Sequence, residues 1–258
     1  MSMTKTPEEI EKLRRGGALL SRALKAAVDA VRPGVAVKDV DAAAEKVIRD
    51  GGGTPSFLDY RNDPKDTPFP STVCVSINDE VVHGPGNRDI TLKEGDIVGL
   101  DIGCWYEGLC TDMAVSVPVG AVDEAATKLM KVTRASLMDA VAAVKPGGLI
   151  SDVGRAVEKS VAPHGYGVVR ALVGHGVGYK VHEAPHVPNF VDPRYPKVKI
   201  KEGMVLALEP MITEGDYRVK TASDGWTVVT VDGKRAAHFE VTIAVTKSGV
   251  EVLTPMPV

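Results

Sequence analysis

The chain has 258 residues, of which 44% are hydrophobic and 25% charged, a balance typical of a globular protein. Its formal net charge of −3 argues against a protein that binds nucleic acid by neutralising phosphates. The sequence has no run of about 18 apolar residues and no apolar N-terminal stretch, so it predicts neither a membrane span nor a secretion signal.

Two helices are predicted at the start of the chain. Residues 6–9 form a capping-box sequence with proline at the first helical position, and apolar residues then recur at helical spacing until the Arg-Pro-Gly stop at 32–34. The basic residues of this helix are interpreted as a solvated face. A second amphipathic helix is predicted over 37–50, the Pro- and Asp-rich segment 59–70 is expected to be a surface loop, and 72–77 is a predicted strand.

A β-hairpin is predicted next, with strands over 96–106 and 110–117. If its turn is centred at 106–107 and the ladder has no bulge, Asp101 lies directly opposite Asp112 and both side chains share one face. Two carboxylates held side by side repel each other unless one is protonated or a cation lies between them. The pair therefore indicates a cation site, although a turn or strand-end role is an equal alternative for either residue alone.

The order of elements repeats in the second half. Helices are predicted over 123–144 and 150–161, with a Lys-Pro-Gly stop at 145–147 between them. Three further strands are predicted near 205–208, 226–231 and 238–245. The sequence thus predicts one α+β domain, 1–258, made of two pseudo-symmetric halves of approximately 1–120 and 121–258. Packed face to face, they would form a curved antiparallel sheet with helices outside.

The most informative feature is a set of residues with oxygen or nitrogen ligand atoms in glycine-rich or β-rich settings: Asp101, Asp112, His175, Glu209 and Glu240. An ionised side chain in the interior is costly unless it is paired or metal-bound, so the set predicts two divalent cations. His175 lies between glycines that allow close approach, and Glu209 precedes a proline that keeps its backbone extended. For Glu240 alone, a surface-facing position is an equal alternative.

A second histidine motif is misleading. Residues 182–186 match the H-E-x-x-H pattern of zincins, which requires one continuous helix. Pro185 disfavours a helix there, so a zincin site is rejected; His182 is interpreted as a cleft residue and His186 as incidental. His83 follows a predicted strand, with a loop histidine as an equal alternative. The remaining two histidines, His164 and His238, are interpreted as structural.

Together these residues resemble the methionine aminopeptidases of peptidase family M24, in their short, bacterial-like type 1 form. The resemblance covers nearly the whole chain in order and spacing, and it is carried by Ser76-Ile77-Asn78, His83-Gly84, Gly95 to Val98, Asp101, Thr111-Asp112, Gly174 to Gly178, His182-Glu183-x-Pro185, Gly203-Met204, Glu209-Pro210, Trp226 and Phe239-Glu240. It implies the pita-bread fold, in agreement with the expected duplication. It also implies removal of the initiator methionine from the N-termini of nascent polypeptides whose second residue is small.

The resemblance further implies a role for each predicted ligand. Asp112 and Glu240 would bridge two divalent metal ions, Asp101 would hold one of them, and His175 and Glu209 would hold the other. Glu209 would also accept the proton of the attacking water and deliver it to the leaving amine. The mixed ligands suit Co²⁺, Mn²⁺, Fe²⁺ or Zn²⁺.

The substrate side is implied in the same way. His83 would steady the scissile peptide, and His182 would hydrogen-bond the developing oxyanion. The methionine side chain would occupy an apolar slot lined by Phe69, Cys74, Val181 and Trp226. Two departures stand out. The loop 59–68 is longer than in familiar bacterial members and borders the slot, and Val241 follows Glu240 where several members carry histidine.

Two other functions remain open at this point. One is a proline-directed peptidase of the same fold, such as aminopeptidase P or prolidase, and the other is a non-catalytic binding module that has lost its metals. The odd number of cysteines without a C-x-x-C pair fits a reducing, cytoplasmic setting. A monomer is the default expectation, and the sequence is silent on ribosome contact.

Overall fold

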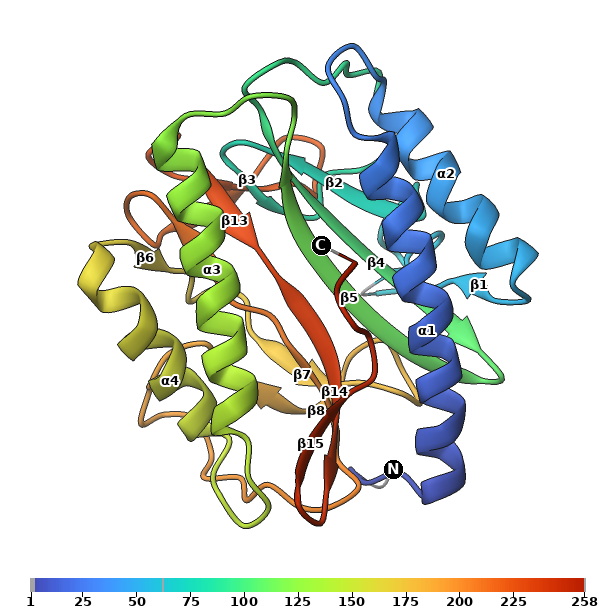
Figure 1. Cartoon of the computed structure of the whole chain (residues 1–258), viewed down its shortest axis with the longest axis vertical. Helices are drawn as coiled ribbons and strands as arrows, with labels where there is room; N and C mark the ends of the chain where they lie inside the picture. The colour runs from blue at the N-terminus through green and yellow to red at the C-terminus, as the bar shows by residue number, and fades with distance from the viewer. Residues whose placement is uncertain (1–2, 62, 258) are drawn as a thin grey trace.

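Two pairs of helices pack on one side of a curved antiparallel sheet in the computed structural model, which describes residues 3–61 and 63–257 (Figure 1). The helices are α1 (Pro7–Ala30), α2 (Val37–Asp50), α3 (Glu124–Ala143) and α4 (Ser151–Val161), followed by the short 3₁₀ helix η1 (Ala162–His164). The capping box of α1 is confirmed, since the Glu9 N–H donates to the Thr6 hydroxyl (3.2 Å) and the Thr6 N–H to the Glu9 carboxylate (2.8 Å).

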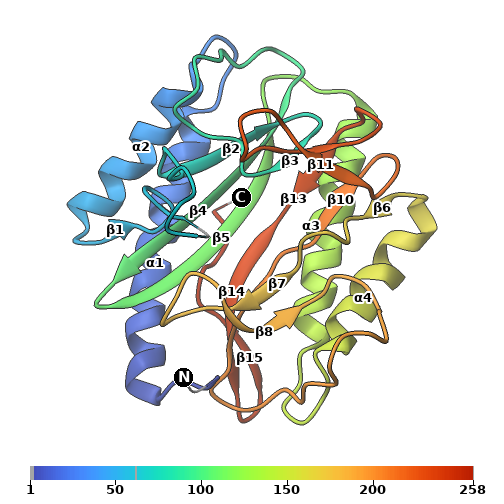
Figure 2. The same ribbon diagram turned by 180° about the vertical axis from the view of Figure 1, so that it is seen from behind.

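The main sheet has nine strands in the order β1-β4-β5-β14-β9-β7-β8, with β2 paired to β4 and β15 to β14 (Figure 2). Its strands are β1 (Thr54–Pro55), β2 (Val73–Ile77), β4 (Ile97–Tyr106), β5 (Leu109–Pro118), β7 (Gly174–Gly176), β8 (Glu183–Val187), β9 (Val205–Leu208), β14 (Glu240–Thr246) and β15 (Gly249–Val252). The pairing of β5 with β14 joins the N-terminal strands to the C-terminal ones.

Two three-stranded sheets flank the main one. The first consists of β13 (Ala236–His238), β10 (Met211–Thr213) and β6 (Gly167–Val168), and the second of β11 (Val219–Thr221), β12 (Val228–Thr230) and β3 (Glu80–Val82). The expected α+β architecture with a curved antiparallel sheet and outer helices is confirmed. The internal duplication stays a prediction, which the repeated order of helix pair and strands supports.

The predicted hairpin register is wrong by two residues. The turn is formed by Glu107 and Gly108, both with positive φ (48° and 81°), so Asp101 pairs with Ala114 and Gly103 with Asp112. Two central residues with positive φ form the tight turn that suits a right-twisted hairpin, and this turn lies one residue later than expected. Since a shift of two residues keeps each side chain on its face, the two carboxylates still point the same way.

Other strands differ from prediction because tertiary pairing decides them. The strand expected over 238–245 is interrupted at Phe239 and becomes β13 and β14, and the one expected over 226–231 is reduced to β12. Residues 183–187 form strand β8, paired with β7, so the rejection of a helix over the H-E-x-x-H sequence is confirmed.

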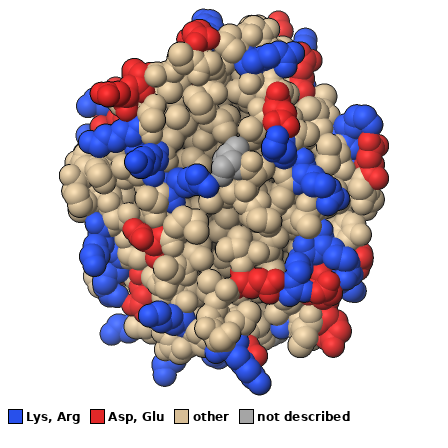
Figure 3. Space-filling view, in the orientation of Figure 1, with Lys and Arg blue, Asp and Glu red and all other residues tan. Residues whose placement is uncertain are grey.

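The core lies between the helices and the sheet. Leu20 and Leu24 of α1, Ile48 of α2 and Leu137 of α3 are fully buried in one cluster with the strands. Outside the core, Lys and Arg alternate with Asp and Glu over the face that carries α1 and α3, in keeping with a solvated face (Figure 3). In the described part of the chain, no helix has the length and apolar character needed to cross a bilayer.

Candidate metal and substrate site

The predicted metal ligands come from neighbouring strands of the main sheet. Glu240 on β14 lies opposite Ala114 of β5, and Ala114 lies opposite Asp101 on β4. Asp112 is two residues from Ala114 and therefore shares its face. The pairing of Val241 with Leu208, and of His175 with Ala207, places Glu209 and His175 on the same face. Register alone thus brings all five ligands to one side of the sheet.

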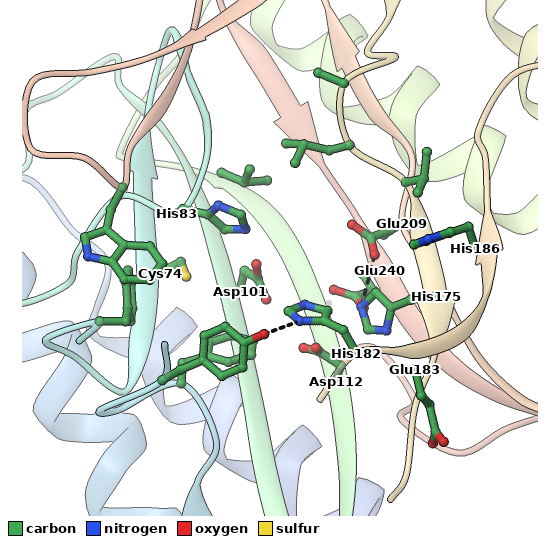
Figure 4. A pocket seen from close by; sticks show the side chains of 18 of the residues that line it. Cys74, His83, Asp101, Asp112, His175, His182, Glu183, His186, Glu209 and Glu240 are labelled. Carbon is green, nitrogen blue, oxygen red and sulfur yellow. Dashed lines mark hydrogen bonds and ion pairs between the residues drawn. The ribbon is translucent and has the colours of Figure 1, made fainter. Parts of the chain in front are cut away.

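The side chains meet at the floor of a cavity of about 510 Å³ (Figure 4). Ligand atoms of Asp112, His175 and Glu240 all lie within 4.8 Å of one another. The His175 Nε2 atom is 3.3 Å from Oε1 of Glu209, and Asp101 lines the same cavity. The structure therefore brings together every residue predicted as a metal ligand.

Hydrogen bonds to neighbouring residues hold three of these predicted ligands in place. The Thr242 hydroxyl accepts from the Asp112 N–H (3.0 Å) and donates to the Asp112 carbonyl (2.7 Å). Nδ1 of His175 lies 3.0 Å from the Gly176 carbonyl, which can only accept, so Nδ1 carries the proton and Nε2 keeps its lone pair for a ligand. The Asn189 amide donates to the Glu209 carbonyl (3.0 Å).

The electrostatics of the cluster call for a cation. Burial, followed by repulsion from the neighbouring carboxylates, raises the pKa values of Asp112, Glu209 and Glu240 well above their usual range. Burial raises the pKa of Asp101 to about 7 and lowers that of His175 to about 3. One oxygen each of Asp101, Asp112 and Glu240 is buried and accepts no hydrogen bond from the described residues. Orphaned carboxylate oxygens beside a neutral imidazole fit divalent transition-metal ions.

Two further histidines face the cavity. His182 stands edge-on to His175, with ring centroids 4.5 Å apart, and its Nδ1 is hydrogen-bonded to the Tyr60 hydroxyl at 2.9 Å. His83 follows β3 with a positive φ of 61° and lines the same cavity. Burial lowers the pKa of both, to about 4 for His83, so each is neutral near pH 7 and can donate one hydrogen bond.

An apolar slot adjoins the polar floor. Phe69, Cys74 and Trp226 line the cavity as predicted, and Phe69 meets Trp226 edge-on at 5.2 Å between centroids. Val181 does not line the cavity in the described structure; its side chain is buried in the apolar cluster that includes Phe69 and Cys74. The wall is completed by Phe57 and Tyr60, which the sequence did not single out.

The sequence profile of metallopeptidase family M24 matches residues 11–247. The chain belongs to metallopeptidase family M24. Among similar proteins is the methionine aminopeptidase of Clostridium perfringens, 42% identical over 98% of this chain and 99% of that protein. The crystal structure of methionine aminopeptidase from Thermotoga maritima superposes with a TM-score of 0.92 at 42% identity, covering 97% of this chain and 98% of that one. The resemblance to methionine aminopeptidases is therefore confirmed.

The pita-bread fold is confirmed as well. The prolidase of Pyrococcus furiosus shares it with a TM-score of 0.78, but at 21% identity and with only 66% of that chain covered, so this likeness concerns the fold alone.

One further buried histidine, interpreted from the sequence as structural, lies beside the predicted ligands. His238 is 3% exposed, its Nε2 has no hydrogen-bond partner among the described residues, and it lies 3.9 Å from Oε2 of Glu240. Its position two residues before Glu240 was the signal in the sequence for its place beside the cluster, because alternate residues of an extended chain share a face. His164, by contrast, is exposed, and His186 lines the edge of the cavity.

Proposed function

We propose that this chain is a metal-dependent aminopeptidase that removes methionine from the N-terminus of polypeptides whose second residue is small. The observation that carries the proposal is the five-ligand cluster at the floor of a cavity whose apolar wall contains Phe69, Cys74 and Trp226. A thioether packs favourably against aromatic rings, so this wall suits a methionine side chain.

The ligand set supports two divalent ions. In the proposed arrangement Asp112 and Glu240 would be shared by the two ions, Asp101 would help to hold one of them, and His175 and Glu209 would help to hold the other. When bound, such a pair lowers the pKa of a water molecule and polarises the scissile carbonyl. Co²⁺, Mn²⁺, Fe²⁺ and Zn²⁺ all accept these ligands, and the experiment below ranks them.

The protein side chains carry the remaining steps. Glu209, whose pKa burial raises, accepts the proton of the attacking water and passes it to the leaving amine. His182 donates a hydrogen bond to the carbonyl oxygen as negative charge develops there. His83 holds the scissile peptide from the opposite wall. Both histidines can act as donors without a charge because burial keeps them neutral.

The rival function is a proline-directed peptidase. The structural likeness to prolidase shows a shared fold and no more, whereas the relatives at about 40% identity over nearly the whole chain are methionine aminopeptidases. A binding module without metals is disfavoured because the five ligand positions are all filled by ligand residues.

We further propose that the substrates are nascent polypeptides in the cytoplasm, met at or soon after the ribosome, and that the enzyme acts as a monomer. The three cysteines are all unpaired, which suits a reducing compartment. The five proposed ligands and Phe69, Cys74 and Trp226 of the slot line one cavity of this chain, which supports a site formed within one subunit.

The test is hydrolysis of Met-Ala-Ser by chelated protein reconstituted in turn with Co²⁺, Mn²⁺, Fe²⁺ and Zn²⁺, with an Xaa-Pro peptide in parallel and Asp112→Asn as a control. Release of methionine only after metal return, and only from the wild type, supports the proposal. Inactivity on Met-Ala-Ser with every metal refutes it; turnover of Xaa-Pro would then identify the proline peptidase, and inactivity on both a binding module.

A further inference from the structure

A buried ion pair joins the N-terminal segment to the loop that carries His182. The Lys5 Nζ atom is 2.6 Å from Oε1 of Glu183, and the two side chains are only 1% and 9% exposed. Removing two charges from water is costly, and a buried pair contributes little to stability compared with an apolar replacement. Stability alone therefore does not explain why this ion pair is buried, which suggests that it has another role.

The Glu183 carboxylate holds the loop closed. Its Oε1 also accepts the N–H of Tyr179 at 3.0 Å, so one oxygen spans residues 179–183 with His182 inside the loop. Lys5 Nζ in turn lies 4.2 Å from the centroid of the Tyr179 ring. Both sides of the loop are thus fixed to the same ammonium group.

The N-terminal segment is itself anchored. The Lys5 N–H donates to the Gly203 carbonyl at 2.7 Å, next to β9. The Tyr179 hydroxyl donates to the Glu9 carboxylate at 2.8 Å, the same carboxylate that caps α1. The Lys5 backbone is therefore fixed to Gly203, just before β9, and the Tyr179 end of the loop is fixed to α1.

We propose that Lys5 is a positioning residue: through its ion pair with Glu183 it holds the 179–183 loop so that His182 points into the cavity. Lys5 does not line the cavity, so it acts only through the loop. The Tyr60 hydroxyl fixes the imidazole ring of His182, and the Lys5–Glu183 pair fixes its backbone. The glutamate of the H-E-x-x-H sequence thereby gains a role unrelated to zincin chemistry. This inference rests on the proposed function for its catalytic readout.

The test compares the full-length, metal-reconstituted wild type with Lys5→Met. We expect kcat on Met-Ala-Ser to fall by about 10²-fold, the loss typical of a catalytic group displaced by 1 Å, with KM and metal content little changed. Lys5→Met/Glu183→Gln should recover part of that loss, because it leaves no charge buried without a partner. The matched control is Arg14→Met, whose ion pair with Glu251 is 43% and 35% exposed. Its kcat should stay within about twofold.

The decisive readout is a double-mutant cycle. In a His182→Ala background, Lys5→Met should change kcat by less than about twofold, because the group it positions is already gone. Deuterium exchange of the Tyr179 amide gives a readout independent of activity, and it should be faster in Lys5→Met but not in Arg14→Met.

An undiminished kcat in Lys5→Met, or an equal loss with and without His182, would overturn the inference. Unchanged exchange at Tyr179 would do the same. If Lys5→Met does not fold, Glu183→Gln takes its place in the cycle with the same criteria. If the wild type releases no methionine with any metal, the proposed function fails, while the exchange measurement still decides whether Lys5 holds the loop.

Discussion

Burial of Asp41 beside strand β2 should lower the free energy of unfolding at neutral pH by an amount that can be measured. Asp41 lies on the inner face of α2, is 9% exposed, and accepts the N–H of Val73 at 2.7 Å. Val73 begins β2, whose next residue, Cys74, pairs with Asp101. Burial raises the pKa of Asp41 to about 6 from an ordinary 3.8, against the opposing effect of the Val73 hydrogen bond.

The sign and size of the effect follow from this shift. Since the folded state holds the proton more tightly than the unfolded state, the contribution of Asp41 to stability is fully present below pH 3.8 and is lost as the pH rises through about 6. A shift of about two units corresponds to about 3 kcal/mol. Asparagine keeps an acceptor for the Val73 N–H and does not titrate, so Asp41→Asn should remove the loss.

The assay is urea unfolding of metal-free wild type and Asp41→Asn from pH 4 to pH 7.5. The difference in unfolding free energy between the two should grow by about 2.4 kcal/mol in favour of the variant over this range, because part of the loss already falls below pH 4. Any pH-independent effect of the new amide on the unfolding free energy cancels in this comparison. The contributions of the buried histidines also cancel, because both proteins contain them. Asp39→Asn, an exposed change on the same helix, controls for lost surface charge. A difference that stays constant with pH would refute the reasoning.

Three further outcomes are expected. Asp101→Asn should lower the metal content measured by mass spectrometry and reduce kcat by at least about 10²-fold, because it removes a buried charge from the cluster. Tyr60→Phe should lower kcat by about tenfold with metal content unchanged, since it deletes the hydrogen bond to the His182 ring; steady-state kinetics on Met-Ala-Ser checks it. Chelation should lower the melting temperature more at pH 8 than at pH 6. Because the carboxylates have raised pKa values, a larger fraction of them is ionised at the higher pH, and without metal the ionised carboxylates repel one another.

Local signals were sufficient to predict the helices and to select the candidate ligands, which stay predictions. The capping box at Thr6 and the apolar periodicity of 37–50 are local features, because each involves residues only a few positions apart. Helix α2 accordingly has the bounds that were expected. The ligands stand in strands whose alternation the sequence displays. The hairpin register failed because it depends on backbone angles at Glu107 and Gly108, which a count of residues does not reveal.

The contacts that hold His182 and its loop in place could not be predicted from local signals. Tyr60 reaches His182 across 122 positions of sequence, and Lys5 reaches Glu183 across 178. Neither contact leaves a periodic or motif-like trace, because only the folded sheet brings the partners together. Strand β8 was missed for a related reason: its pairing with β7 overrides the unfavourable Ala184-Pro185 sequence.

Substitutions of the predicted ligands and substitutions of the residues that support the substrate-facing histidines should therefore have different effects. The predicted ligands lie in or next to strands of the main sheet, so changing one should alter the cluster charge and the metal content together. His182 lies on a loop whose supports, Lys5 and Tyr60, are not among the predicted ligands. A change in these supports can move a hydrogen-bond donor without altering the cluster, and turnover then changes while metal content does not. Measuring metal content beside kcat in each variant thus separates loss of the reaction centre from misplacement of the groups around it.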